Sequence, residues 1–430
     1  MQRGFVGLGL FTRHRSLTLA VVGLALALQG CAGIDRFGER GGRPVTQAPA
    51  SAGSLPGSQD QPSSQSVVEM PLDAPINSTL GQSDSVPGSG AAGTGAAVAL
   101  LLPLSASGQV GELAQAMKNA AELAQSEYKG TQLRLLVKDE GGQAEGARSA
   151  ARAAQTEGAQ VFLGPLLSSS VQAAAAVTRP AGKALIGFST DQTVAGRGVY
   201  LLSFQPDNDI EQILAYAASK GKTSIAALIP EGVYGNVMVA AFQEQASRRG
   251  LKIASIERYQ AATVETAVKA IAALTVPVDA LLIPEGGDQA TALNTALLSH
   301  GIDKKGWQIL GTSAWDESRV LKEPIFQGGW FAGPDKTGFI SFARRYQARF
   351  GKEPPRLASL AYDAVFLVNA LSAQYGTQAF TESVIRNPDG MIGTDGLFRF
   401  RNNGGIQRSL AIYEVTNGTV RTLQDPLSRF

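Results

Sequence analysis

The chain has few of the residues from which disulfides, metal sites and nucleophilic catalytic groups are built. It contains one cysteine and two histidines among 430 residues. A single cysteine cannot form an intrachain disulfide, so the folded part must be stabilised by its own apolar core. Only His300 lies beyond the first 30 residues, which leaves no partner for a histidine metal site or for a Cys–His or Ser–His–Asp group. The sequence also lacks a G-x-x-x-x-G-K-[ST] loop. We therefore expect no enzyme activity, no cofactor and no metal.

An excess of charge of one sign is also lacking. The formal net charge is +2, and no tract or stripe of Arg and Lys stands out along the sequence. Proteins that bind nucleic acid usually carry a basic surface of that kind. We therefore expect no nucleic-acid partner.

The apolar runs are too short for a membrane-spanning helix. The most apolar one, 17–28, has twelve residues, whereas a transmembrane helix needs roughly 20. It follows a basic opening and fits the centre of a secretory signal sequence. The next residues, Leu28-Gln29-Gly30-Cys31, resemble a bacterial lipobox, although Gln29 is unusual at its position. This resemblance implies cleavage before Cys31 and a lipid anchor on its sulfur. A secreted protein with a free thiol is the alternative.

The first 93 residues are thus expected to target and tether the protein. Residues 1–30 are the predicted lipoprotein signal peptide, and 31–93 the lipidated cysteine with a linker rich in Gly, Ser, Pro, Ala and Gln. Such a composition cannot offset its ordering entropy, which predicts a disordered tether. Its root-mean-square reach is roughly 45 Å, and it could also be only a spacer. Ala32 after the cysteine implies, by analogy with other lipoproteins, sorting to the outer membrane. The predicted location is the periplasmic side of a bacterial membrane, lipid-anchored.

A regular alternation of strands and helices begins at residue 96. Residues 96–103 form a continuous apolar run, as expected for a strand buried on both faces. In 111–128, apolar residues recur at spacings of three and four, which predicts a helix. Further strands are expected at 133–139, 160–165, 184–189, 199–204, 224–230, 252–260, 278–285 and 307–313, and further helices at 144–158, 168–180, 209–221, 235–250, 263–274, 288–301, 339–350 and 357–375.

This alternation restarts at Asp207, and a single open sheet of such size would be unusual. We therefore expect an α/β fold with two lobes, each a doubly wound parallel sheet. The last stretch, 397–418, is hairpin-like, with turn signals at Asn402–Gly405 and Asn417–Gly418.

Residues 96–430 resemble the type I periplasmic-binding-protein family, the group that includes leucine/isoleucine/valine-binding proteins. The segments that carry the resemblance occur in the family's order, at 101–124, 138–151, 161–177, 229–250 and 395–418. The resemblance implies one binding-protein-like domain over 94–430. It also implies three hinge crossings, near Ser203–Pro206, Phe331–Pro334 and Gly396–Phe400. Lobe 1 would then comprise about 94–203 and 333–397, and lobe 2 about 204–332 and 398–430.

Candidate ligand contacts follow the carboxyl ends of the expected strands, where open α/β sheets bind ligands. Ser168, Ser169 and Ser170 open a helix, where a capping serine and free backbone N–H groups suit a carboxylate. A capping serine that binds no ligand is the alternative. The resemblance implies that Ser189 and Thr190 supply hydroxyl and backbone groups to an amino-acid ligand.

The second lobe also supplies candidate contacts. The resemblance implies that Tyr234 is the tyrosine with which the family contacts its ligand, although it could instead pack the turn before its helix. It further implies an acid that pairs with the ligand's ammonium group. Asp316, Glu317 or Glu285 could serve, or each could be a solvated loop residue.

Two non-enzymatic functions fit these features. The sequence is most similar to the penicillin-binding-protein activators, lipoproteins whose binding-protein-like domain docks on a class A peptidoglycan synthase. The "LGPLL" before the serines and the segment 278–318 resemble their counterparts, and the lipobox and tether suit a protein that reaches through the cell wall. The best-known activators carry an additional N-terminal helical-repeat domain, where this sequence has only the tether.

The expected function is therefore to bind and activate a class A penicillin-binding protein. Trp307, Trp315 and Trp330 are candidate anchors for that partner, or core residues. The alternative is a receptor that binds an amino acid of the branched-chain type, or a peptide, and serves an ABC transporter.

Overall fold

The computed structural model describes residues 95–130 and 133–430 of the chain. The predicted signal peptide, the predicted lipidation site Cys31 and the predicted tether up to residue 93 lie outside the described residues. Among the residues that are described, no helix combines the length and apolar character needed to cross a bilayer.

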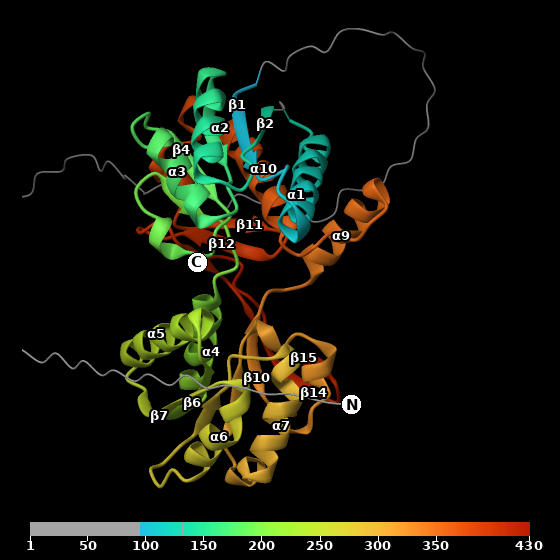
Figure 1. Ribbon diagram of the computed structural model, residues 1–430. Helices are drawn as coiled ribbons and strands as arrows, with labels where there is room; N and C mark the ends of the chain where they lie inside the picture. The colour runs from blue at the N-terminus through green and yellow to red at the C-terminus, as the bar shows by residue number, and fades with distance from the viewer. Residues whose placement is uncertain (1–94, 131–132) are drawn as a thin grey trace, which may run out of the picture. The chain divides into compact units, whose positions relative to one another are not determined.

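The predicted α/β fold is confirmed, with parallel strands in two sheets and helices on both faces of each (Figure 1). The first sheet has the order β2-β1-β3-β4-β5, and all neighbouring strands are parallel. Its strands are β1 (Ala97–Leu102), β2 (Arg134–Asp139), β3 (Ala159–Leu163), β4 (Ala184–Gly187) and β5 (Val199–Leu201).

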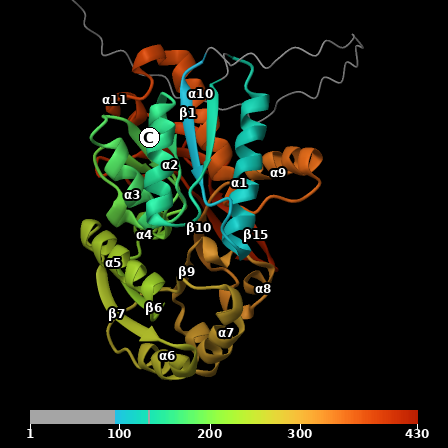
Figure 2. The same cartoon turned by 45° about the horizontal axis from the view of Figure 1, so that its top comes forward.

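Alternate side chains of β1 point to opposite faces of the first sheet, and both faces are covered. Val98 and Leu100 pack in the core that α1 and α10 close, whereas Ala99 and Leu101 pack in the core that α2 and α3 close. Helices α2 and α3 lie side by side (Figures 1 and 2). The lobe's helices are α1 (Gly108–Glu127), α2 (Ala144–Thr156), α3 (Ser168–Thr178), α9 (Thr337–Phe350), α10 (Ala358–Tyr375) and α11 (Glu382–Ile385). Burial on both faces explains why the strand sequence is almost solidly apolar.

The second sheet is mixed, with the order β15-β14-β10-β9-β8-β6-β7. The neighbouring strands β10, β9, β8, β6 and β7 are parallel to one another. Strands β14 and β15 add an antiparallel edge beside β10. A two-residue turn at Asn417 and Gly418 joins that edge pair, and both residues have positive φ, as hairpin turns of this type require. The strands are β6 (Ser224–Pro230), β7 (Lys252–Tyr259), β8 (Ala280–Leu282), β9 (Gln308–Gly311), β10 (Trp330–Gly333), β14 (Ala411–Thr416) and β15 (Thr419–Gln424).

The helices of the second lobe also cover both faces of its sheet. Helices α4 and α5 share one apolar core, and α6 and α7 share the other. The helices are α4 (Pro206–Ser219), α5 (Val233–Arg248), α6 (Val264–Ala272), α7 (Ala290–Ser299) and α8 (Ser318–Leu321). Short 3₁₀ helices in the chain are η1 (Gln192–Val194), η2 (Ala261–Thr263), η3 (Gly287–Gln289), η4 (Ile302–Lys305), η5 (Ser313–Trp315), η6 (Pro324–Phe326) and η7 (Gly376–Gln378).

The third crossing between the lobes lies later than the expected position at Gly396–Phe400, so that prediction is wrong. A small antiparallel sheet of β11 (Met391–Gly393), β12 (Gly396–Phe400) and β13 (Ile406–Arg408) intervenes. Its apolar side chains belong to the first lobe's core, and the ring of Phe400 lies 5.3 Å from that of Tyr200.

The chain therefore reaches the second sheet only at the start of β14, and the stretch 398–408 belongs to lobe 1 instead of lobe 2. The expected closing hairpin is two separate strand pairs, β12 with β13 and β14 with β15. An alternating apolar pattern shows that a face is buried but does not show which core buries it.

Candidate ligand-binding site

A pocket of about 450 Å³ lies where strands of the second sheet end and the chain crosses between the lobes. This volume is in the range of small-molecule sites. The start of α4, the first turn of α5 and the segment after β9 form one part of its wall. Arg356, Arg408 and residues next to the crossings form the other part. The wall thus combines segments that are far apart in the sequence.

Asp209 is the most enclosed acid in this pocket. It lies in the first turn of α4 and is 7% exposed. Its Oδ2 accepts hydrogen bonds from the backbone N–H of Ser313, at 2.8 Å, and from the Ser313 hydroxyl, at 2.5 Å. Burial raises the pKa of Asp209 to about 7, although these two hydrogen bonds oppose the shift. The carboxyl therefore joins α4 to the segment after β9 and titrates near neutral pH.

Tyr234, the predicted contact in the second lobe, does line the pocket. It lies in the first turn of α5, and its hydroxyl donates a hydrogen bond of 2.8 Å to the carbonyl oxygen of Pro284. Burial of the hydroxyl raises the pKa of Tyr234 to about 12, while 37% of the residue's surface is exposed. The hydroxyl proton is thus engaged within the protein, and the exposed part of the side chain is what a ligand could meet.

The predicted acids Asp316 and Glu317 also line the pocket, but both are already ion-paired. Asp316 pairs with Lys336, and Glu317 pairs with Arg319 at 3.1 Å. Glu285, the third candidate, accepts a hydrogen bond from the Tyr259 hydroxyl and does not line this pocket. None of the three therefore presents an unpaired carboxylate.

The predicted contacts of the first lobe do not line the pocket, although they lie close to one another in the fold. These contacts are Ser168, Ser169, Ser189 and Thr190. They follow the carboxyl ends of the neighbouring strands β3 and β4. Ser189 accepts a hydrogen bond of 3.1 Å from the N–H of Asp191. Hydrogen bonds from Thr193, and a weaker one from Ser168, lower the pKa of Asp191. Ser168 and Ser189 thus already have partners in the η1 loop.

The expectation of a serine N-cap at this helix is wrong. The N-cap of α3 is Leu167, and no side chain caps the helix there. Ser170 is instead buried and donates a hydrogen bond of 2.9 Å to Glu140, whose side chain is also buried. Burial raises the pKa of Glu140. When several serines stand at the start of a helix, the sequence alone does not show which residue is the N-cap.

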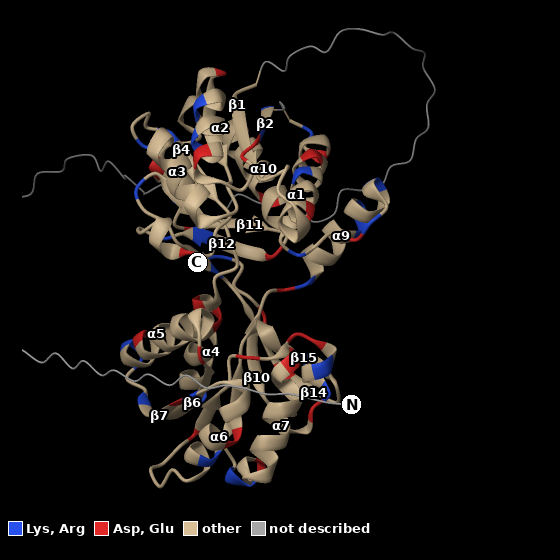
Figure 3. Ribbon diagram, viewed as in Figure 1, with Lys and Arg blue, Asp and Glu red and all other residues tan. Residues whose placement is uncertain are grey.

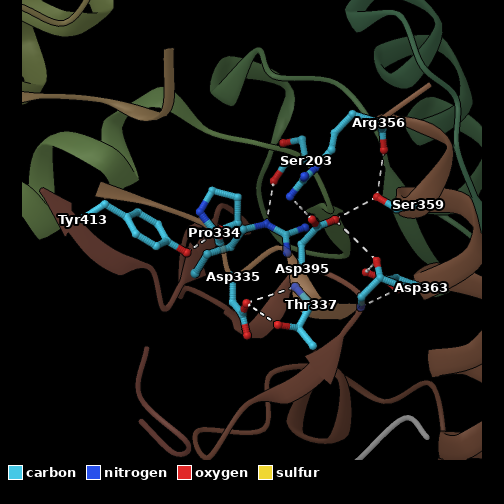
Figure 4. A network of polar contacts seen from close by, with 11 residues as sticks. Ser203, Pro334, Asp335, Thr337, Arg356, Ser359, Asp363, Asp395 and Tyr413 are labelled. Carbon is cyan, nitrogen blue, oxygen red and sulfur yellow. Dashed lines mark hydrogen bonds and ion pairs between the residues drawn. The ribbon is translucent and has the colours of Figure 1, made fainter. Parts of the chain in front are cut away.

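A second group of charged residues adjoins the pocket and was not predicted from the sequence. Figure 4 shows Asp363, from α10, and Asp395 among the contacts of this network. Thr394 donates its backbone N–H and its hydroxyl to Asp363, at 2.9 and 3.1 Å. Ser359 donates its hydroxyl to Asp395 at 2.8 Å. Burial, with a further contribution from the charge of Asp395, raises the pKa of Asp363 to about 7.

Two arginines complete this network. Arg356 forms an ion pair with Asp395, whose side chain is fully buried (Figure 4). Arg408 is 2% exposed, and its Nε donates a hydrogen bond of 3.2 Å to the carbonyl oxygen of Ser203. Burial lowers the pKa of Arg408, while the charges of Asp395 and Asp363 oppose the shift. Both arginines line the pocket.

One sequence signal could have pointed to this group. Asp363 is the only charged residue in the mainly apolar helix sequence 357–371, and a charged residue is almost never fully buried unless it is paired. No comparable signal marks Arg356 or Arg408, because neither stands within a long apolar run.

Charged side chains elsewhere give no sign of a nucleic-acid or metal site. Over the described part of the chain, Lys and Arg are interspersed with Asp and Glu on both lobes (Figure 3). The same residues contain no group of three or more His, Cys, Asp and Glu side chains that could hold a metal ion. Of the tryptophans considered as docking anchors, Trp315 is fully buried and donates a hydrogen bond of 3.0 Å to the carbonyl oxygen of Ile283. It is a core residue, whereas Trp307 and Trp330 are partly exposed.

Comparisons with known proteins agree with this fold. The sequence model of a family described as "Periplasmic binding protein" matches residues 96–419. No match was found among curated proteins.

Solved structures with this fold come from several bacteria. A candidate branched-chain amino acid ABC transporter from Rhodospirillum rubrum is 19% identical, with a TM-score of 0.66, and the match covers 76% of this chain and 100% of that chain. A substrate-binding protein of an ABC transporter from Desulfitobacterium hafniense, in complex with Leu, is 19% identical, with a TM-score of 0.54 and coverage of 76% and 99%. A solute-binding protein from Rhodopseudomonas palustris, in complex with 3,4-dihydroxybenzoic acid, is also 19% identical, with a TM-score of 0.52 and coverage of 78% and 97%. At this identity the likeness shows the fold alone.

Proposed function

Because the chain belongs to the periplasmic binding protein family, we propose that it is a solute receptor that binds an amino acid or a similar small molecule and serves an ABC transporter. Membership of the family implies a periplasmic location. The observation that carries the proposal is the 450 Å³ pocket with acidic and basic side chains in one wall. A wall with this mixed polar and charged lining suits a small polar solute. The ligands of the similar structures, Leu and 3,4-dihydroxybenzoic acid, support a small solute.

The proposed contacts in the second lobe are Tyr234, Asp316 and Glu317, because all three line the pocket. Ser168, Ser169, Ser189 and Thr190 stay predicted contacts from the family resemblance. A peptide ligand is a further possibility that the same experiment covers.

The test is thermal unfolding of the purified protein with a panel of the standard L-amino acids, short peptides, benzoate and 3,4-dihydroxybenzoate. A solute at 100 times its dissociation constant adds roughly 2.7 kcal/mol to the free energy of unfolding. We expect a reproducible rise in melting temperature with at least one member. No rise with any member would contradict the proposal.

The activation of a class A penicillin-binding protein, which the sequence alone placed first, is a second candidate. The comparisons favour the receptor, since the similar structures are solute-binding proteins. The "LGPLL" segment, the lipobox and the tether still support the activator. The deciding measurement is the rate of glycan polymerisation by such a synthase with and without the protein. A rise in that rate would support activation, and an unchanged rate would remove it.

We also propose that a lipid on Cys31 holds the protein at the outer membrane, on its periplasmic side, with residues 31–93 as the tether. The support is the lipobox-like sequence after the apolar run. Cys31→Ser should leave an unprocessed precursor that takes up no labelled palmitate. Normal labelling of that variant would contradict the anchor.

A further inference from the structure

Arg356 and Arg408 are held side by side by aromatic rings at the crossing end of the pocket. The guanidinium carbon of Arg408 lies 4.9 Å from the ring centre of Phe204 and 5.3 Å from that of Phe398. The guanidinium carbon of Arg356 lies 4.4 Å from the ring centre of Phe339 and 5.7 Å from that of Phe204. Rings that cover the faces of a guanidinium leave its N–H edges for hydrogen bonds, and those edges match the two oxygens of a carboxylate.

The positive charge of this pair is not fully balanced by the protein. Neither Nη atom of Arg408 has a hydrogen-bond partner among the described residues, although the side chain is 2% exposed. Of the two acids that act on Arg408, Asp395 is already ion-paired with Arg356. Burial raises the pKa of Asp363 to about 7, so it carries only part of a negative charge at neutral pH. Since buried polar groups are nearly always hydrogen-bonded, the unpartnered Nη atoms point to an anionic partner.

The acids elsewhere in the pocket would repel such an anion only weakly. Asp316 and Glu317 are each neutralised by a cation. Asp209 has a pKa raised to about 7 by burial and already accepts two hydrogen bonds from Ser313. The wall is therefore positive at the Arg356 end, which is also reachable, since 33% of the Arg356 side chain is exposed.

We propose that Arg356 and Arg408 form a carboxylate subsite, and that the ligand's carboxylate binds there instead of at the hydroxyls of Ser189 and Thr190. Arg356 donates directly to the carboxylate, and the buried Arg408 supports it with its positive charge. The subsite rests on the proposed solute-binding function and extends it. Its ligands include amino acids and plain organic acids, because the recognised group is the carboxylate.

The first part of the test compares each carboxylate with its own carboxamide. Every solute of the panel that binds is titrated by calorimetry, and so is the matching amide: L-leucine with L-leucinamide, for example, or benzoate with benzamide. We expect the amide to bind at least about tenfold more weakly, since it lacks the negative charge that strengthens hydrogen bonds from the arginines. An amide that binds as tightly as its acid would overturn the subsite and leave the receptor proposal intact. No binding by any panel member would overturn both.

The second part uses two variants with opposite expected effects. Arg356→Gln removes the direct donor and should weaken carboxylate binding about tenfold or more. Asp395→Asn removes the carboxylate that competes for Arg356, so it should strengthen carboxylate binding several-fold. Both variants disturb the same buried ion pair. A purely structural role would therefore weaken binding in both.

The matched control is Arg248→Gln, which removes an exposed arginine at the end of α5 that pairs with Glu244; neither residue lines the pocket. We expect its affinity for carboxylates to equal that of the wild type. Unchanged affinity in Arg356→Gln, or weaker binding in Asp395→Asn, would overturn the subsite.

Discussion

The two places where a ligand could bind differ in how far their polar atoms are already satisfied. In the first lobe, Ser168 and Ser189 bond to the neighbouring η1 loop, and the group carries no cation. In the pocket, Arg408 keeps two buried Nη atoms without a hydrogen-bond partner among the described residues. Polar atoms that already have hydrogen-bond partners in the protein can form fewer hydrogen bonds to a ligand than buried charged atoms that lack such partners.

The proposed carboxylate subsite therefore rests on hydrogen-bonding groups that lack partners, whereas the predicted first-lobe contacts rest on position in the fold. The first-lobe serines follow the strand ends, where ligands of such sheets bind. The pocket that Arg356 and Arg408 line combines strand ends of the second sheet with charged side chains from the crossings.

Replacing Arg408 with alanine should have the largest effect, a lower free energy of unfolding. The change leaves Asp363 and Asp395 without one of their compensating charges and removes the guanidinium between Phe204 and Phe398. Removal of a large, fully buried side chain leaves a cavity and costs about 2–5 kcal/mol of unfolding free energy. Urea denaturation measures the loss. The exposed control Arg421→Ala, on β15, should lose less than about 1 kcal/mol. Equal losses of unfolding free energy in the two variants would show that the buried Arg408 stabilises the fold no more than an exposed arginine does.

The second-largest effect is expected in how the free energy of unfolding changes with pH. The pKa of Asp363 is raised from 3.8 to about 7, so the folded chain holds this proton more tightly than the unfolded chain. Its stabilising contribution is therefore complete below about pH 4 and is lost as the pH rises toward 7, at up to about 1.4 kcal/mol per pH unit. Urea denaturation between pH 4 and 8 should show a shallower fall in Asp363→Asn than in the wild type.

The exposed Asp425→Asn serves as a control for the loss of one surface carboxylate. It should keep the slope of the wild type. An identical slope in Asp363→Asn would show that this carboxyl titrates in the folded chain as it does in the unfolded one.

In the first lobe, Ser170 and Ser169 form a matched pair of neighbours. Ser170→Ala removes the hydroxyl that donates to the buried Glu140 and should cost about 1–3 kcal/mol. Ser169 is exposed, and Ser169→Ala should change the unfolding free energy by no more than about 0.5 kcal/mol. Comparable values for both would mean that the Ser170–Glu140 contact adds nothing to stability.

The smallest effect is expected for Ser189→Ala on ligand affinity. If the carboxylate binds at Arg356, loss of this hydroxyl should weaken binding by less than about threefold, well under one charge-assisted hydrogen bond. Calorimetric titration measures it beside Arg356→Gln. A larger loss for Ser189→Ala than for Arg356→Gln would reverse the comparison between the two places.

Most of the fold could be predicted from the sequence because its signals are local. The apolar run at 96–103 and the helical spacing at 111–128 each report burial of a nearby face. The third crossing could not be predicted, since Phe398 and Phe400 show a buried face but not which core receives it. The antiparallel edge of the second sheet likewise depends on which strands pair.

The site was harder to predict because its wall is assembled from distant segments. Tyr234, Asp316 and Glu317 line the pocket, as their positions after strand ends suggest. Asp209 and Ser313, 104 residues apart, are joined only by the fold. Arg408 gains its properties from burial, which its polar sequence surroundings did not indicate.

The most direct test is a crystal structure of the protein with the tightest-binding carboxylate of the panel. If Arg356 forms the subsite, the ligand's carboxylate oxygens will lie about 2.7–2.9 Å from the Arg356 guanidinium nitrogens, the usual distance for charge-assisted hydrogen bonds. A carboxylate bound instead to the hydroxyls of Ser189 and Thr190, away from Arg356, would contradict it.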